Sequence, residues 1–117
     1  MQQGWGIGSD IIEIQRIRLA CHRHAKFITR HFTAGEIAYC ARYRDPFPHY
    51  AGHLAAKEAV AKALGTGICA TLSWLQIDIQ HTHLGQPTVH LEHVHGSILL
   101  TISHCKDYAT STALWMP

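Results

Sequence analysis

Residues 53–67 read HLAAKEAVAKALGTG, and this stretch predicts the helix around which the rest of the chain is arranged. Ala, Leu, Lys and Glu lose little backbone or rotamer freedom in helical geometry. Gly65 follows the last apolar residue, at the position where many helices end in a left-handed conformation that glycine adopts without strain. We therefore expect the helix to end at Leu64 and to pack one apolar face onto a sheet.

Two charged residues of this helix, Glu58 and Lys62, are candidates for a functional site. They are four residues apart, which places their β-carbons about 5–6 Å from each other on one face. Such pairs are also common on surfaces, where they contribute only about 0.3–0.5 kcal/mol. A second acid, Asp10, interrupts the apolar run of residues 6–14, which predicts a buried strand. An ionised carboxylate there needs a cation or several hydrogen bonds, unless Asp10 merely marks the end of the strand.

The remaining elements are predicted from local patterns. Arginines and lysines alternate with apolar residues between positions 16 and 30, which is typical of short basic helices. Thr33 and Glu36 have the spacing of a capping box, so a helix should begin at Ala34. The prolines of residues 45–48 should end it, and the central helix should follow from about His49. Two-residue alternation then predicts a meander of antiparallel strands at residues 74–80, 88–91, 97–104 and 108–114.

Composition narrows the class of protein. A chain of 117 residues with 47% hydrophobic residues fits one domain over residues 1–117 with a core of its own. It contains no apolar run of about 18 residues, as a membrane span needs, and its start does not resemble a leader, so we expect a cytoplasmic protein. The four cysteines are widely spaced, which favours reduced thiols.

The charge is uneven along the chain. Residues 1–62 carry nine Lys or Arg and five Asp or Glu, whereas residues 63–117 carry one and three, for a net charge of +2. The basic half favours an acidic partner or a polyphosphate, but the charge is too small to indicate a nucleic-acid-binding protein. The 11 histidines should add positive charge below about pH 6.5.

Four blocks of sequence resemble those of the holo-acyl-carrier-protein synthases, which are small phosphopantetheinyl transferases. The blocks follow the family's order and spacing over nearly the whole chain, at residues 6–17, 32–36, 55–67 and 101–109. The resemblance implies an α+β fold in which helices pack on a small antiparallel sheet. It also implies a homotrimer with active sites between subunits.

The resemblance further implies an activity. Enzymes of this family move the 4'-phosphopantetheine arm of coenzyme A onto a serine of apo acyl carrier protein and release adenosine 3',5'-bisphosphate. The family's metal ligands match Asp10 and Glu58, and Mg²⁺ prefers such oxygen ligands; Mn²⁺ is the alternative. Lys62 matches a residue that neutralises the leaving phosphate. The proton of the serine would go to Glu58 or to a metal-bound water, and the sequence does not choose between them.

Family matching also gives contacts for coenzyme A and for the carrier protein. The coenzyme A contacts match Arg44, His53, Lys62, Gly85, Pro87, Ser103 and His104. His53 stands where relatives commonly carry Arg, and Gln86 replaces the Lys of a Gly-Lys-Pro turn. Because a guanidinium binds phosphate with two hydrogen bonds, we expect weaker coenzyme A binding above neutral pH unless another histidine compensates. The acidic helix of the carrier protein would dock on Arg16, Arg23 and Phe27, which otherwise form a solvated charged face.

Two other functions remain open. Three His-x-His pairs, which on a strand would each point two imidazoles to one face, allow a non-enzymatic transition-metal-binding protein; they are His22/His24, His81/His83 and His93/His95. A module that binds a carrier protein without catalysis is the third reading. Zinc or nickel retained without transferase activity would favour the first alternative, and carrier binding without transfer would favour the second.

Overall fold

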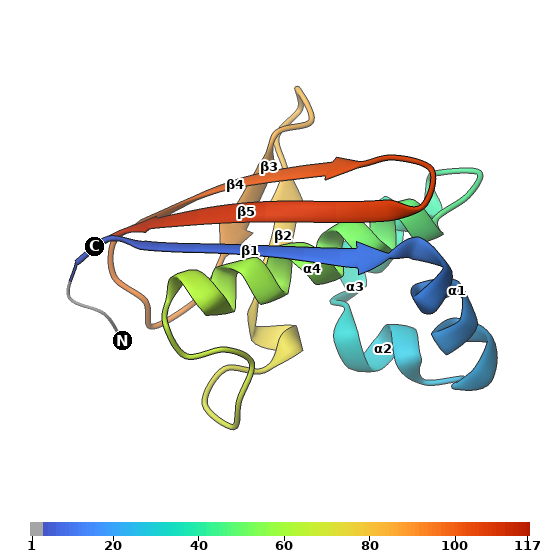
Figure 1. Cartoon of the computed structure of the whole chain (residues 1–117), viewed down its shortest axis with the longest axis horizontal. Coiled ribbons are helices and arrows are strands. Elements are labelled where there is room, and N and C mark those ends of the chain that lie inside the picture. The colour runs from blue at the N-terminus through green and yellow to red at the C-terminus, as the bar shows by residue number, and fades with distance from the viewer. Residues whose placement is uncertain (1–3) are drawn as a thin grey trace.

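The structure is a computed structural model that describes residues 4–117. A long helix, α4 (Phe47–Ala63), lies against a three-stranded antiparallel sheet with strand order β1-β5-β4 (Figure 1). The strands of this sheet are β1 (Gly6–Glu13), β4 (Ser97–His104) and β5 (Tyr108–Met116). The short helices at one end of the sheet are α1 (Ile14–Arg23), α2 (Phe27–His31) and α3 (Ala34–Ala41). This arrangement confirms the α+β fold. Within the described residues, no helix has the length and hydropathy needed to cross a bilayer.

Helix α4 ends at Ala63, one residue before the predicted end. Leu64 caps it, and Gly65 follows with φ of 81°. The helix begins at Phe47, two residues before the predicted start, because Pro48 falls in the first turn, where no backbone N–H is needed for helical hydrogen bonding. The expectation of a single packed face is wrong. From Tyr50 to Ala63 every residue is buried except Glu58 and Lys62, so the helix is covered on nearly all sides.

Strand β1 approaches α4 closely at Gly8. A β-carbon there would collide with backbone atoms of Ala59 and Ala63, so only glycine permits this approach. The contact brings Asp10, two residues further along the same face of the strand, beside α4. The prediction of a fully buried strand is wrong, because exposed and more buried residues alternate along β1.

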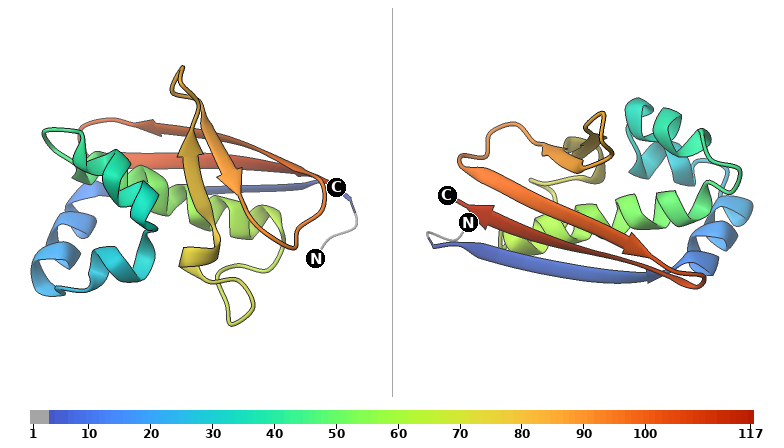
Figure 2. Two further views of the ribbon diagram at one scale, coloured as in Figure 1. Left: turned by 180° about the vertical axis from the view of Figure 1, so that it is seen from behind. Right: turned by 90° about the horizontal axis from the view of Figure 1, so that it is seen from above.

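The predicted single meander is also wrong. Strands β2 (Asp78–His81) and β3 (Pro87–His90) form a separate two-stranded sheet, and β5 pairs with both β4 and β1 (Figure 2). Residues Trp74–Gln76 form a 3₁₀ turn, η1, instead of the start of a strand. Ser73 and Gln76 stabilise this turn by a reciprocal capping box, which competes with the extended conformation that alternation favours. The capping box of Thr33 and Glu36 is confirmed, and α3 begins at Ala34.

The face of the three-stranded sheet opposite α4 carries exposed apolar side chains. Ile7 is 70% exposed and Leu99 is 54% exposed. Both are paired with Leu114 of the central strand, so they form one apolar row across the sheet. No described helix covers this face (Figure 2).

Candidate active site

The three charged residues predicted from the sequence meet where β1 crosses α4. The Nζ atom of Lys62 donates to Asp10 Oδ1 at 3.2 Å and to the backbone oxygen of Ser9 at 3.0 Å. Asp10 and Glu58 line the same pocket, which has a volume of about 530 Å³. The pKa of the Glu58 carboxyl is raised, first by burial and then by the negative charge of Asp10, while Lys62 lowers it. The two acids and the amine therefore act on one another electrostatically.

Asp10 and Glu58 fit a hard divalent cation. Two neighbouring carboxylates carry like charges that repel each other, so a cation between them is stabilising. Mg²⁺ usually combines one or two protein carboxylates with oxygens from water and substrate phosphates. Across residues 4–117, no three His, Cys, Asp or Glu side chains come together as a metal site. Any cation held here would therefore need oxygens from a bound phosphate or water. Among the described residues, the three His-x-His pairs likewise belong to no cluster of three such side chains.

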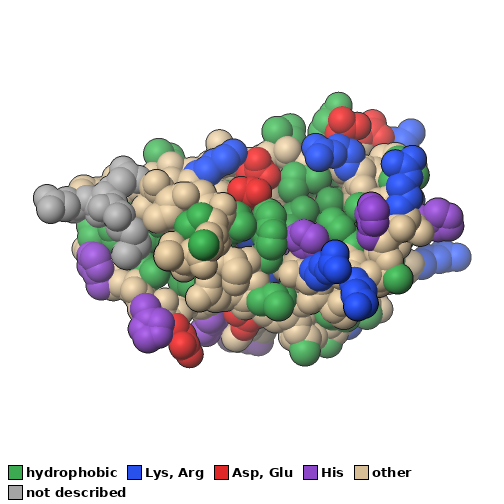
Figure 3. Space-filling view, turned by 90° about the horizontal axis from the view of Figure 1, so that it is seen from below, with side chains coloured by type: hydrophobic (Ala, Val, Ile, Leu, Met, Phe, Trp, Pro, Cys, Tyr) green, Lys and Arg blue, Asp and Glu red, His purple; other side chains and the backbone are tan. Residues whose placement is uncertain are grey.

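The walls of the 530 Å³ pocket contain the predicted carrier-protein residues. Arg16 and Arg23 come from α1 and Phe27 from α2, and Leu54 and Trp74 add apolar surface. Figure 3 shows a face on which acidic side chains lie beside hydrophobic ones, with Lys, Arg and His side chains around them. The carboxylates thus lie beside a surface that is both basic and apolar.

Most of the predicted coenzyme A contacts lie elsewhere. His53, Gly85, Pro87 and His104 line a second cavity of about 170 Å³, together with His49 and His81. Arg44 and Ser103 are exposed and do not line this cavity, and Lys62 lies with Asp10. His53 and Glu58 are five residues apart on α4, so they point about 140° away from each other around the helix axis. One chain alone therefore does not bring the coenzyme A contacts and the carboxylates into one pocket.

His53 is almost fully buried at the back of the second cavity. It is 2% exposed, its Nδ1 lies 3.6 Å from Sγ of Cys40, and its Nε2 has no hydrogen-bond partner. An unpaired buried polar atom of this kind costs about 1–3 kcal/mol. Burial, followed by the charges of His81 and Lys57, lowers the pKa of His53 to about 3. His53 is therefore uncharged at neutral pH, and loss of its charge is not a source of weaker coenzyme A binding above pH 7.

The lowered pKa of His53 predicts a pH-dependent stability. The unfolded chain protonates His53 below its ordinary pKa of 6.5, whereas the folded chain does so only near 3. The contribution of His53 to the free energy of unfolding is therefore fully present above pH 6.5. It decreases as the pH falls below 6.5, by about 2 kcal/mol at pH 5. Urea unfolding at pH 8 and pH 5 should show a smaller loss for His53→Gln than for the unmodified chain. Equal losses in both would contradict the assignment.

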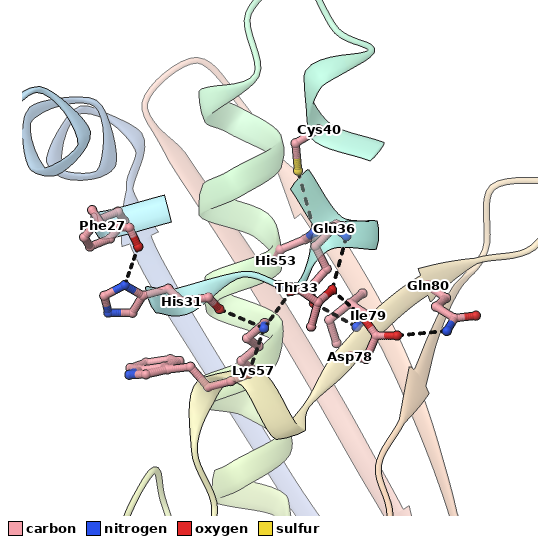
Figure 4. A network of polar contacts seen from close by, with 11 residues as sticks. Phe27, His31, Thr33, Glu36, Cys40, His53, Lys57, Asp78, Ile79 and Gln80 are labelled. Atoms are coloured by element: carbon pink, nitrogen blue, oxygen red, sulfur yellow. Dashed lines mark hydrogen bonds and ion pairs between the residues drawn. The ribbon is translucent and has the colours of Figure 1, made fainter. Parts of the chain in front are cut away.

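A buried ion pair, which the sequence interpretation missed, holds α4 in place (Figure 4). Lys57 Nζ lies 2.7 Å from Glu36 Oε1, and both side chains are fully buried. Lys57 also donates to the backbone oxygens of His31 and Trp74, each at 2.8 Å. The carboxylate of Glu36 accepts in addition from the backbone N–H of Thr33 at 2.7 Å and of Ile79 at 2.8 Å. A single ammonium therefore joins α4 to α2, α3 and η1, while Glu36 reaches β2.

This ion pair also supports the 530 Å³ pocket. Lys57 directly precedes Glu58, and it binds the segment that carries Trp74 in the pocket wall. The ring of His31 stacks on Phe27 at 4.3 Å and lies 5.2 Å from Trp74. The only feature of the sequence that could have indicated this buried ion pair is a lysine among alanines, in a helix with few other polar residues.

Comparison with known proteins identifies the family. The sequence model of the 4'-phosphopantetheinyl transferase superfamily matches residues 6–113. The holo-[acyl-carrier-protein] synthase of Chlamydia pneumoniae is 46% identical over 114 residues, which are 92% of this chain and 93% of that protein. A crystal structure of the holo-(acyl-carrier-protein) synthase of Bacillus anthracis in complex with CoA (3',5'-ADP) superposes with a TM-score of 0.87, at 34% identity and 95% coverage of both chains. The Helicobacter pylori enzyme in complex with coenzyme A gives a TM-score of 0.82 at 32% identity, covering 92% of this chain and 96% of that one. The chain therefore belongs to the 4'-phosphopantetheinyl transferase superfamily and, within it, to the holo-[acyl-carrier-protein] synthases.

Proposed function

We propose that this chain transfers the 4'-phosphopantetheine arm of coenzyme A to a serine hydroxyl of an apo acyl carrier protein. The products are holo acyl carrier protein and adenosine 3',5'-bisphosphate, and the reaction would take place in the cytoplasm. The observation that carries the proposal is the meeting of Asp10, Glu58 and Lys62 beside a 530 Å³ pocket in a member of this family. The solved structures of two relatives with coenzyme A support the choice of donor.

Asp10 and Glu58 are the proposed ligands of a Mg²⁺ ion. When bound, this ion would neutralise charge on the diphosphate of coenzyme A. The chain's own contribution is to hold the two carboxylates together, through the close contact of β1 with α4 at Gly8.

Glu58 and Lys62 are the proposed catalytic residues. The serine oxygen forms a bond to the phosphorus next to the pantetheine, and the bond from that phosphorus to the leaving bisphosphate breaks. Glu58 accepts the serine proton, because its carboxylate lies in the pocket beside which the carrier protein is proposed to dock. Lys62 stabilises the charge that develops on the leaving phosphate. Its side chain is 50% exposed, so it is free to move from Asp10 toward a substrate.

The carrier protein is proposed to dock beside this pocket. Arg16 and Arg23 would pair with acidic residues of the carrier, and Phe27 would contact its apolar surface. Because these residues border the pocket of Glu58, a docked carrier would present its serine next to the proposed base.

The second cavity is proposed to bind one phosphate group of the nucleotide part of coenzyme A, with His53, Gly85, Pro87 and His104 as contacts. Arg44 and Ser103, which do not line this cavity, are proposed as further contacts of the nucleotide. Since this cavity and Glu58 lie on different sides of α4, we propose that a homotrimer completes the site, with the nucleotide residues of one subunit facing the carboxylates of the next. The apolar row of Ile7, Leu114 and Leu99 on the uncovered sheet face supports this assembly.

Leu99→Asp is expected to dissociate the trimer and to abolish most transfer activity, because it places a charge in the apolar row. Analytical ultracentrifugation would measure the mass of the assembly. Leu75→Asp is the matched control, since Leu75 is 48% exposed, lies outside this sheet and lines neither cavity, so its replacement should leave the mass of the assembly unchanged. A Leu99→Asp protein with the mass of the unmodified assembly would contradict the role of this face.

The proposed function is tested by incubating the protein with apo acyl carrier protein, coenzyme A and Mg²⁺ and following the mass of the carrier. We expect a gain of one phosphopantetheine group per carrier, lost when the acceptor serine is replaced by alanine. A carrier of unchanged mass that nevertheless binds the protein would favour the non-catalytic binding module.

A further inference from the structure

Cys40 and His53 form a buried pair behind the second cavity. Cys40 is fully buried in α3, and His53 is nearly so in α4. Their contact, Sγ to Nδ1 at 3.6 Å, is the hydrogen bond that the structure gives to the His53 ring. The other ring nitrogen, Nε2, is buried without a partner.

The chemistry of the two groups decides which of them donates. Burial, and then the charge of Glu36, raises the pKa of the Cys40 thiol to about 12, so the thiol keeps its proton at neutral pH. Sulfur is a weak hydrogen-bond acceptor, whereas the unprotonated nitrogen of a neutral imidazole is a good one. The S–H of Cys40 therefore donates to Nδ1, and the proton of the neutral ring is placed on Nε2. His53 thus holds an uncharged N–H donor that no protein atom accepts.

The cavity in front of His53 suits a phosphate group. Its lining includes four histidines, at positions 49, 53, 81 and 104, and no carboxylate. Its volume of about 170 Å³ is sufficient for one phosphate group but small for a whole nucleotide. The half-buried ring of His81 lies 5.1 Å from that of His53. The ring of Tyr39 also stacks near His53, at 5.3 Å, and on His81, at 3.8 Å, so a phosphate oxygen reaches Nε2 only when His81 moves aside.

We propose that Cys40 is a positioning residue for coenzyme A, whose thiol orients His53 so that Nε2–H donates to an oxygen of the 3'-phosphate. This inference rests on the proposed function, because it assumes that coenzyme A is the ligand. It assigns to this chain an uncharged donor, fixed by a thiol, at the position where relatives commonly carry a guanidinium.

Nuclear magnetic resonance of the ¹⁵N-labelled His53 ring tests the orientation directly. At pH 7 we expect an unprotonated Nδ1 and a protonated Nε2 in the free protein, and Cys40→Ala should shift the Nδ1 resonance. A protonated Nδ1 in the unmodified protein would overturn the proposal. If Cys40 only filled space in the core, it would not determine which nitrogen of the His53 ring carries the proton.

Calorimetric titration with coenzyme A and with 3'-dephospho-coenzyme A tests the consequence for binding. His53→Leu should weaken coenzyme A binding about tenfold and Cys40→Ala about fivefold, with little change for the dephospho compound. Cys40→Ser, which keeps an O–H donor, should bind nearly as the unmodified protein does. Ile77→Val is the matched control, because it also removes a small part of a fully buried side chain and lies outside the cavity lining.

The double variant Cys40→Ala/His53→Arg separates this effect from a general loss of packing. A guanidinium needs no thiol to hold its protons, so Cys40→Ala should have no effect on coenzyme A binding in the His53→Arg background. An equal loss in both backgrounds would overturn the proposal. An unmodified protein that binds neither compound would instead refute the proposed function, so the two failures are distinguishable.

Discussion

Glu58→Gln is expected to slow phosphopantetheine transfer by a hundredfold or more while the protein stays folded. The change removes both the base that accepts the serine proton and one of the two proposed metal ligands, and loss of a general base alone costs about 10²–10⁴-fold. Glu58 is only half-buried and lies near the negative charge of Asp10, so removing its charge should not destabilise the fold. Initial rates of carrier modification, with thermal melting of the same sample, measure both effects.

The control for this variant is Glu92→Gln. Glu92 is an exposed glutamate outside both cavities, and its replacement should leave the transfer rate unchanged. Normal turnover by Glu58→Gln would refute its assignment as base and ligand.

Lys57→Met is expected to lower the free energy of unfolding by about 3–5 kcal/mol. Methionine fills much of the same volume, but it leaves the Glu36 carboxylate buried without its cation and removes the donor from the backbone oxygens of His31 and Trp74. Single domains have stabilities of only about 5–15 kcal/mol, so this loss is a large share of the total. Urea unfolding at pH 7.5 measures it.

A second substitution separates the charge from the packing. Lys57→Met combined with Glu36→Gln should recover part of the lost stability, because no uncompensated charge then remains buried. Lys106→Met, at an exposed position, is the control and should change stability by less than about 0.5 kcal/mol. A Lys57→Met protein as stable as this control would show that the buried pair contributes no net stability.

Local signals in the sequence predicted the elements whose ends are set by local hydrogen bonds. The capping box of Thr33 and Glu36 is confirmed, and the end of α4 is predicted to within one residue, because backbone geometry within a few residues decides both. Glu36 was predicted only as a cap. Its pairing with Lys57 joins residues 21 positions apart in the sequence, and no local pattern indicates such a contact.

The predicted single meander was wrong because the strand order depends on pairing between segments that are far apart in the sequence. The last strand, β5, lies between β4 and the first strand, β1, so the sheet depends on a contact between the two ends of the described chain. The candidate site was predicted in part: Asp10 and Lys62 do meet, and Arg16, Arg23 and Phe27 line the pocket of Glu58. The pKa of His53 follows from burial against its neighbours, which spacing along the chain does not reveal.

Anomalous diffraction from crystals grown with coenzyme A and Mn²⁺ tests most directly whether Asp10 and Glu58 share one cation. We predict a single strong peak bonded to both carboxylates and to oxygens of the coenzyme A diphosphate, with Lys62 beside the same phosphates. A peak bonded to neither carboxylate, or coenzyme A bound with its diphosphate away from them in every copy of the assembly, would contradict the proposed site.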